Sequence, residues 1–436
     1  MPADTAIHFF LQLAVILVAC RVAGLVAQRI GQPQVVGEMI AGVVLGPSLL
    51  GRVAPELQHH LFPPGTANIV LYTAAQIGLV LYMFIIGLNF DVNHVRQRAG
   101  TAAAVSIAGT LVPLALGALA AVPLLGSGVF FGDGVSVGMA MMFLGASIAI
   151  TAFPMLARII FEKGLSGTSL GTLALACGAT ADAISWCVLA VVLAVHRSSP
   201  TMAIVAIVGG LVYTLVLLTF GRRALGALGR ATEQRQAISP SALSTVLILL
   251  MACAWFTDTI GIYAIFGAFI LGAAMPSGFF AGQLTDKLEP LTTRLLLPLF
   301  FVYSGLNTQI GLVNTPMLWA VTLGLLVVAV VGKGVACAVA ARMSRVPMRE
   351  SVALGSLMNA RGLIELILLN IGLEAGIITP TLFAILVLVA IATTLMASPV
   401  FEFVYGRHRR APDGGATAED TGGLVPVEQG YSRGRE

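Results

Sequence analysis

The chain has 436 residues, of which 58% are hydrophobic and only 10% are charged, and its formal net charge at pH 7 is +4. A soluble globular protein carries roughly a quarter of charged residues, so this composition excludes one soluble core and predicts a polytopic, all-α membrane protein. The small net charge excludes a nucleic-acid-binding protein, which needs a concentrated basic face.

The cysteines and the N-terminal segment argue against a disulfide, a zinc site and a signal peptide. No two cysteines form a C-x-x-C pair and all lie in apolar stretches, so no disulfide, no zinc site and no cofactor are expected. They are Cys20, Cys177, Cys187, Cys253 and Cys337. The first apolar run has neither a basic segment before it nor a small-residue cleavage site, which favours a membrane span over a signal peptide.

About thirteen hydrophobic runs are long enough to cross the lipid bilayer as helices. In chain order they cover residues 7–28, 33–50, 67–90, 99–124, 136–160, 169–195, 201–220, 239–257, 260–277, 290–307, 315–341, 350–374 and 378–402. From residue 407 to 436 the chain is polar and rich in Gly, Pro and Asp, which predicts a short disordered tail. We therefore expect one transmembrane domain over residues 1–406.

The lysines and arginines indicate how the spans are oriented. If the spans alternate and the N-terminus is outside, most of the 24 Lys and Arg residues fall at inner loops and inner helix ends. Only Arg52 and Arg197 then fall in outer loops. The positive-inside rule therefore places the C-terminus in the cytoplasm, and we expect the membrane to be the bacterial inner membrane.

Thirteen spans divide into two six-helix halves joined by one helix. The first repeat covers about 7–195, the linking helix 201–220 and the second repeat about 239–402. A single linking span places the halves in opposite orientations, which is typical of secondary transporters with inverted repeats. The fifth run, 136–160, then corresponds to the twelfth, 350–374.

Both of these corresponding runs contain residues that loosen a helix. Such interruptions at mid-membrane are tolerated where the freed backbone lines a cavity, so a matched pair predicts a binding site. The alternative is that Gly and Pro are simply commoner in membrane helices. The residues concerned are Gly145, Ser147, Thr151 and Pro154 in the fifth run and Gly355, Asn359, Arg361 and Gly362 in the twelfth.

Asp182 lies midway along the sixth run, where an ionised side chain costs about 3 kcal/mol. One interpretation is a structural acid that stays protonated or bonds a nearby hydroxyl such as Thr180 or Ser185. The other is a carboxylate that alternately holds a proton and a cation, because burial favours the protonated acid and a bound cation favours the ionised one. Competition for one site is the simplest route to exchange.

Among the other ionisable residues within predicted spans, four bear on the site or on helix packing. Lys333 either takes part in the site or extends its amine toward the cytoplasmic face. Arg361 is expected to offset the negative end of a half-helix, and Glu365 lies at the i,i+4 spacing that suits an ion pair with it. We expect Glu38 to serve helix packing or gating.

Several motifs in the right order carry a family resemblance. They are QVVGEM at 34–39, AGVVLGP at 41–47, LYMFIIGL at 81–88, ITAFP at 150–154, GIYAIFGAF at 261–269 and MNARGLIEL at 358–366. They resemble the cation/proton antiporter superfamily, with its sodium/proton exchanger-like membrane domain. The nearest branch holds bacterial potassium efflux antiporters and plant cation/proton exchangers, and the likeness covers about residues 7–403.

The resemblance implies a homodimer in which each protomer has a scaffold and a core that moves like an elevator. The core would carry two broken helices that cross, and Asp182 matches the ion-binding aspartate. Thr151, Ser147 and Asn359 supply oxygens at similar depth and are expected to join that site. The implied activity is exchange of a monovalent cation, Na⁺ or K⁺, for H⁺ in pH homeostasis, with no metal beyond the transported cation.

One departure from the resembling proteins bears on stoichiometry. Electrogenic relatives pair an aspartate before the binding aspartate with a lysine that matches Lys333, but here that position is Ala181. We therefore expect electroneutral exchange of one cation for one proton. The alternatives are a cation channel, although no selectivity-filter motif is present, or a transport-inactive sensor with the same fold. An intramembrane enzyme is not expected, because no catalytic constellation such as H-E-x-x-H occurs.

Overall fold

The computed structural model is helical and describes residues 2–63, 66–90, 99–196, 200–235, 237–306, 312–361 and 364–406. Its helices in the first half of the chain are α1 (Pro2–Arg29), α2 (Gln34–Leu45), α3 (Leu50–Val53), α4 (Pro55–Leu61), α5 (Thr66–Leu88), α7 (Ala99–Leu125), α8 (Val137–Ala149), α9 (Phe153–Glu162), α10 (Ser169–His196) and α11 (Pro200–Val216). The second half continues with η1 (Leu217–Gly221), α12 (Arg222–Arg235), α13 (Pro240–Thr259), α14 (Ala264–Ala274), α15 (Phe279–Leu291), η2 (Thr292–Leu296), α16 (Leu297–Leu306), α17 (Pro316–Ala329), η4 (Val330–Val335), α18 (Ala336–Met343), α19 (Met348–Met358), α20 (Ile364–Glu374), α21 (Pro380–Phe401) and η5 (Glu402–Gly406). The η segments are π turns. Among the described residues only an isolated bridge, Phe131 to Ile378, is extended pairing.

Nine helical segments of the described chain are long and apolar enough to cross a membrane. They include α1, α7 and α13, and also stretches such as Pro316–Met343 in which two helices continue through a π turn. The expected count of thirteen spans stays a prediction. The count of long segments is lower partly because the twelfth run forms two short helices of 11 residues each, α19 and α20. Neither is long enough to span the bilayer alone.

Large apolar side chains cover much of the outer surface. Phe10 is 67% exposed, Leu211 67%, Trp255 69% and Leu323 58%. A soluble protein rarely exposes so much contiguous apolar surface, whereas a bilayer solvates it well. The surface therefore agrees with an integral membrane protein.

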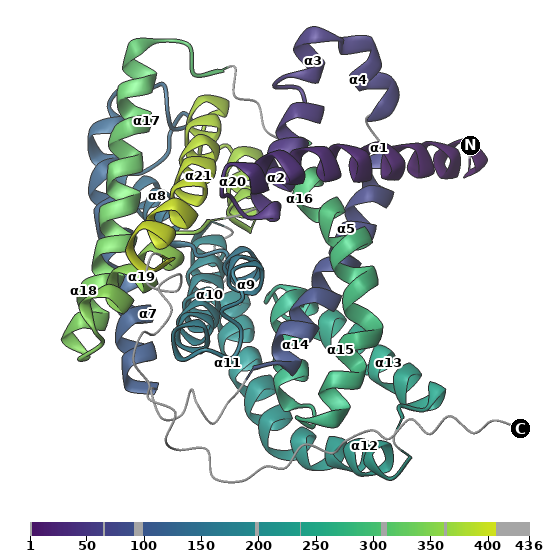
Figure 1. The fold of residues 1–436 in the computed structure, drawn as a ribbon. Helices are drawn as coiled ribbons and strands as arrows, with labels where there is room; N and C mark the ends of the chain where they lie inside the picture. The colour runs from purple at the N-terminus through teal and green to yellow at the C-terminus, as the bar shows by residue number, and fades with distance from the viewer. Residues whose placement is uncertain are drawn as a thin grey trace, which may run out of the picture.

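The helices pack into two groups that lie side by side (Figure 1). The first group, at the right of Figure 1, joins α1, α2 and α5 to α13, α14 and α16. The second, at the left, joins α7, α8 and α10 to α17–α21. Each group thus combines helices from both halves of the chain. Helix α9 touches both groups, because it packs against α10 and also against α2 and α5.

Glycines of two motifs allow the closest helix crossings in the first group. A Cβ added at Gly87 of α5 would lie 2.3 Å from the carbonyl oxygen of Phe269 in α14. A Cβ at Gly42 of α2 would lie 2.6 Å from the carbonyl oxygen of Val302 in α16. Only glycine fits at such separations, which is how membrane helices commonly approach one another.

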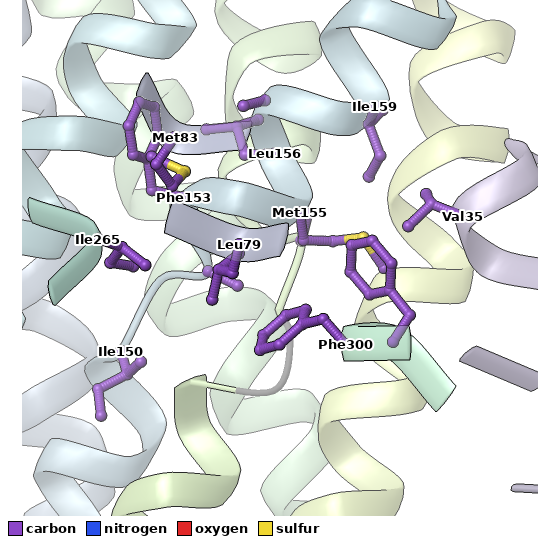
Figure 2. Packing of buried hydrophobic residues seen from close by; sticks show 14 of the residues in the cluster. Val35, Leu79, Met83, Ile150, Phe153, Met155, Leu156, Ile159, Ile265 and Phe300 are labelled. Atoms are coloured by element: carbon purple, nitrogen blue, oxygen red, sulfur yellow. The ribbon is translucent and has the colours of Figure 1, made fainter. Parts of the chain in front are cut away.

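The apolar core continues between the two groups along α9. Figure 2 shows side chains converging there from α2, α5, α9, α14 and α16, among them Val35, Met83, Phe153, Ile265 and Phe300. Phe153 packs edge-on against Phe269 of α14, with ring centroids 5.0 Å apart. This packing fixes the N-terminal end of α9, which follows directly on the helix break of the fifth run.

Candidate functional site

The fifth run is broken between α8 and α9. Helix α8 ends at Ala149 and α9 begins at Phe153, while Ile150 turns into extended backbone with φ −56° and ψ 136°. Ile150, Thr151 and Ala152 are all buried. The break therefore leaves the last carbonyls of α8 without intrahelical partners inside the membrane domain.

Two residues predicted to form this break lie beside it instead. Gly145 is inside α8, where an added Cβ would lie 2.6 Å from the carbonyl oxygen of Leu114, so its role is close packing against α7. Pro154 is in the first turn of α9. Proline suits that position because the missing N–H would have no partner there anyway.

The twelfth run is broken between α19 and α20. Helix α19 ends at Met358, Asn359 turns with φ −80° and ψ −6°, and α20 begins at Ile364. Ala360 and Arg361 are buried and non-helical, and Gly362 lies outside the described residues. Thr394 of α21 holds this break: its hydroxyl accepts from the Arg361 N–H at 3.0 Å and lies 2.6 Å from the Arg361 carbonyl oxygen. Thr394 was not predicted as a site residue, although Thr393 and Thr394 form a polar pair in an otherwise apolar run.

Two buried cationic side chains meet the C-terminal end of α8, where the backbone carbonyls lack intrahelical partners. The Arg361 guanidinium donates to the carbonyl oxygens of Ser147, at 3.1 Å, and of Ile148. The Lys333 amine donates to the carbonyl oxygen of Ala149. Three successive carbonyls at the negative end of the half-helix are thus bonded to positive charges, which stabilises that end electrostatically.

The position of Lys333 excludes one of its two interpretations. Its side chain is fully buried in the π turn η4, so the amine does not extend to the cytoplasmic face. The neighbouring charges that attract it are Glu365 and Asp182, and Arg361 repels it. Lys333 therefore belongs to the same electrostatic cluster as the helix break.

Glu365 completes the charge pairing of Arg361. Its Oε1 lies 3.2 Å from Arg361 Nη1, at the i,i+4 spacing noted in the sequence, and both side chains are buried. Glu365 Oε2 has no hydrogen-bond partner among the described residues. Removing either partner of a buried ion pair leaves the other as an uncompensated buried charge, so this pair is costly to break.

Asp182 lies in α10, which packs against α8, α9 and α19, and only 3% of its surface is exposed. The two hydroxyls considered in the sequence as its structural partners, those of Thr180 and Ser185, donate to backbone carbonyls. Thr180 donates to the carbonyl oxygen of Ala176 at 2.9 Å, and Ser185 to that of Ala181 at 2.7 Å. Ala181, the residue directly before Asp182, is fully buried.

Oxygen atoms at both breaks are free to accept a ligand. Thr151 Oγ1 and Asn359 Oδ1 are buried and have no hydrogen-bond partner in the described part of the chain. The Ser147 hydroxyl differs, because it donates to the carbonyl oxygen of Phe143 at 2.8 Å. A buried oxygen without a donor costs free energy unless something binds it, so Thr151 and Asn359 are the better candidates for ion ligands.

Comparison with known proteins gives a consistent result. A family described as "Sodium/hydrogen exchanger, transmembrane" matches residues 14–405. The Na⁺/H⁺ antiporter NhaS4 of Synechocystis is 39% identical over 407 residues, which cover 93% of this chain and 99% of the relative. Cation/H⁺ antiporter 18 of Arabidopsis thaliana is 34% identical over 94% of this chain, but the match spans only 50% of that relative.

A solved structure shares the fold. The sodium proton antiporter MjNhaP1 of Methanocaldococcus jannaschii superposes with a TM-score of 0.66 at 16% identity, covering 91% of this chain and 95% of the other. At this identity the likeness concerns the arrangement of helices alone.

Proposed function

The chain belongs to the sodium/hydrogen exchanger family, and on that premise we propose that it exchanges Na⁺ or K⁺ for H⁺ at Asp182 by alternating access. As a member of this family it is an integral membrane cation/proton antiporter and not an enzyme. The choice of cation, the carboxylate and the one-for-one stoichiometry are the proposed parts. The cations and protons are the transported substrates.

The observation that carries the proposal is a buried carboxylate within the electrostatic cluster of a helix break. Lys333 bonds the carbonyl of Ala149, two residues before Thr151. Asp182 lies in α10, which packs against α8, α9 and α19, the helices that border the two breaks. The unbonded oxygens of Thr151 and Asn359 belong to the same two breaks. We infer that Asp182, Thr151 and Asn359 ligate the cation, with Ser147 as a further candidate.

Charge counting supports one site for two competing ligands. Lys333, Arg361, Glu365 and Asp182 sum to zero when all four are ionised. Adding either a proton or a monovalent cation then changes the cluster by the same single charge. Because a buried cluster tolerates little excess charge, both ligands binding at once is disfavoured.

The two helix groups suit the alternating-access part of the proposal. We infer that the group with α1, α2, α5, α13, α14 and α16 is the scaffold, which pairs with a second protomer, and that the group with the two breaks is the moving core. The inverted repeats, the homodimer and the external N-terminus are parts of the same proposal. A channel or a transport-inactive sensor is the alternative.

Reconstitution into liposomes with an internal pH reporter tests the function. Adding Na⁺, K⁺ or Li⁺ outside a proton-loaded vesicle is expected to raise the internal pH for at least one of them. The Asp182→Asn protein, which keeps the shape of the side chain, is expected to lose this response while remaining folded. Cation flux that ignores a proton gradient would favour a channel, and near wild-type exchange by Asp182→Asn would remove Asp182 from the site.

A further inference from the structure

A second polar site lies away from the two helix breaks. A cavity of about 830 Å³ opens between α1, α2, α9 and η2. Its charged wall residues are Arg21, Glu38, Arg158, Glu162, Lys163, Glu289 and Arg294. Two contacts join α2 of the first helix group to α9 across this wall: the Gln34 N–H donates to Glu162 Oε2, and Arg158 Nη2 lies 3.8 Å from Glu38 Oε1. The cavity therefore lies where the first helix group meets α9.

Glu38 is the most deeply placed of these charges. Its side chain is 0% exposed in the middle of an apolar stretch of α2. Its Oε1 accepts a hydrogen bond from Gln34 Nε2 at 3.0 Å and lies 3.8 Å from Arg158 Nη2. Its Oε2 is buried and has no hydrogen-bond partner among the described residues.

Arg158 does not neutralise Glu38 fully, because it is shared. Its Nε lies 2.6 Å from Glu162 Oε1, a much closer contact than the one with Glu38. One guanidinium therefore serves two carboxylates, and the trio of Glu38, Glu162 and Arg158 carries one net negative charge when all are ionised. A buried excess charge is costly, and either a proton or a bound cation can remove it.

The other charges on the wall leave this imbalance in place. Lys163 is bonded to Glu402 at 2.9 Å. The charges that act most strongly on Glu38 are those of Arg158 and Glu162, and not those of Arg21 or Arg294. Tyr82 of α5 lies in the field of the same trio, and its buried hydroxyl also has no hydrogen-bond partner in the described chain.

We propose that Glu38 is the carboxylate of a second binding site for a monovalent cation, at the inner wall of this cavity. One cation at Glu38 Oε2 would satisfy the orphan oxygen and cancel the excess charge at once. The sequence alone favours packing or gating for Glu38, and the free oxygen is what points beyond those roles. The inference rests on the proposed function only in taking the transported cation as the ligand.

The test measures cation binding in a protein whose first site is disabled. Binding of ²²Na⁺ or ⁸⁶Rb⁺ to the full-length, detergent-solubilised Asp182→Asn protein is followed by scintillation proximity. We expect one saturable binding component to remain in this protein. Adding Glu38→Gln to Asp182→Asn is expected to raise the dissociation constant of that component at least about tenfold. Glu38→Asp, which keeps the charge but shortens the reach, is expected to weaken it less than Glu38→Gln does.

Glu289→Gln is the matched control, because it removes a carboxylate from the same cavity wall. Added to Asp182→Asn, it is expected to leave the dissociation constant of the remaining component within about twofold of the value for Asp182→Asn alone. Absence of saturable binding in Asp182→Asn, or binding that Glu38→Gln leaves unchanged, would overturn the second site. Neither outcome bears on exchange at Asp182, which the liposome assay tests separately.

Discussion

Thr151 and Asn359 show how little side-chain chemistry the proposed site needs. Each offers one buried oxygen that has no hydrogen-bond partner among the residues that the structure describes. Backbone carbonyls freed by the breaks can complete a shell around a monovalent cation, since such ions are held by oxygen ligands of the right number and spacing. Selectivity between Na⁺ and K⁺ would then depend on the size of this shell.

Thr151→Val tests this at the residue scale. Valine keeps the volume and branching but removes the oxygen, so we expect the half-saturating cation concentration to rise more than the maximal rate falls. Rates in liposomes across a range of cation concentrations separate the two. Thr322→Val is the control, because its buried hydroxyl donates to its own helix at Leu318. An unchanged half-saturating concentration in Thr151→Val would remove this oxygen from the site.

Arg361→Gln tests the electrostatic cluster. The substitution leaves Glu365 as an uncompensated buried charge and frees two carbonyls of α8, so we expect a loss of about 3–5 kcal/mol in stability. Adding Glu365→Gln should recover part of that loss, because the unpaired charge disappears. Thermal unfolding of the two single variants and the double variant gives the coupling directly. Strictly additive effects would show that the pair does not act as a unit.

The sequence anticipated part of this chemistry and not the rest. The spacing of Arg361 and Glu365 predicts their pairing, because i,i+4 side chains meet on any helical turn. The bonds from Arg361 to Ser147 and Ile148, and from Lys333 to Ala149, join residues more than a hundred positions apart, which no local pattern encodes. The contact of Arg158 with Glu38 is hidden for the same reason, whereas its pairing with Glu162 has the i,i+4 spacing.

At the scale of elements, the hydrophobic runs predict where helices lie but not how they are subdivided. The run 136–160 corresponds to α8 plus α9 and the run 350–374 to α19 plus α20. Gly and Pro mark the neighbourhood of each break, yet Gly145 serves packing and Pro154 begins a helix. The π turn that holds Lys333 has no evident sequence signature, since hydropathy reads straight through it.

Gly145→Ala tests the packing that positions the end of α8. The added methyl would meet the carbonyl oxygen of Leu114, so α8 and α7 must separate, and we expect a loss of about 1–3 kcal/mol in stability together with reduced transport. Gly138→Ala, in the same helix, meets nothing within 4 Å and is the control. Equal unfolding temperatures for the two variants would show that this crossing is not tight.

At the scale of the whole molecule, the proposed exchange moves no net charge. The core would cross either with Asp182 protonated or with Asp182 and a bound cation, and the two forms carry the same charge. An imposed membrane potential, worth about 2.3 kcal/mol per charge at 100 mV, should therefore leave the rate and end-point of exchange unchanged. A sustained current on a solid-supported membrane would contradict the one-for-one scheme, and its loss in a Lys333 variant would then make Lys333 the second proton carrier.

The central claim is that one carboxylate holds either the proton or the cation, and competition kinetics test it most directly. Initial exchange rates are measured in liposomes at many cation concentrations over a series of acidic pH values. If the proton and the cation compete at Asp182, the half-saturating cation concentration should rise as the pH falls, approaching about tenfold for each pH unit. The maximal rate at saturating cation should stay constant. A half-saturating concentration that does not change with pH, with a maximal rate that falls, would place the proton at a different site and contradict the account.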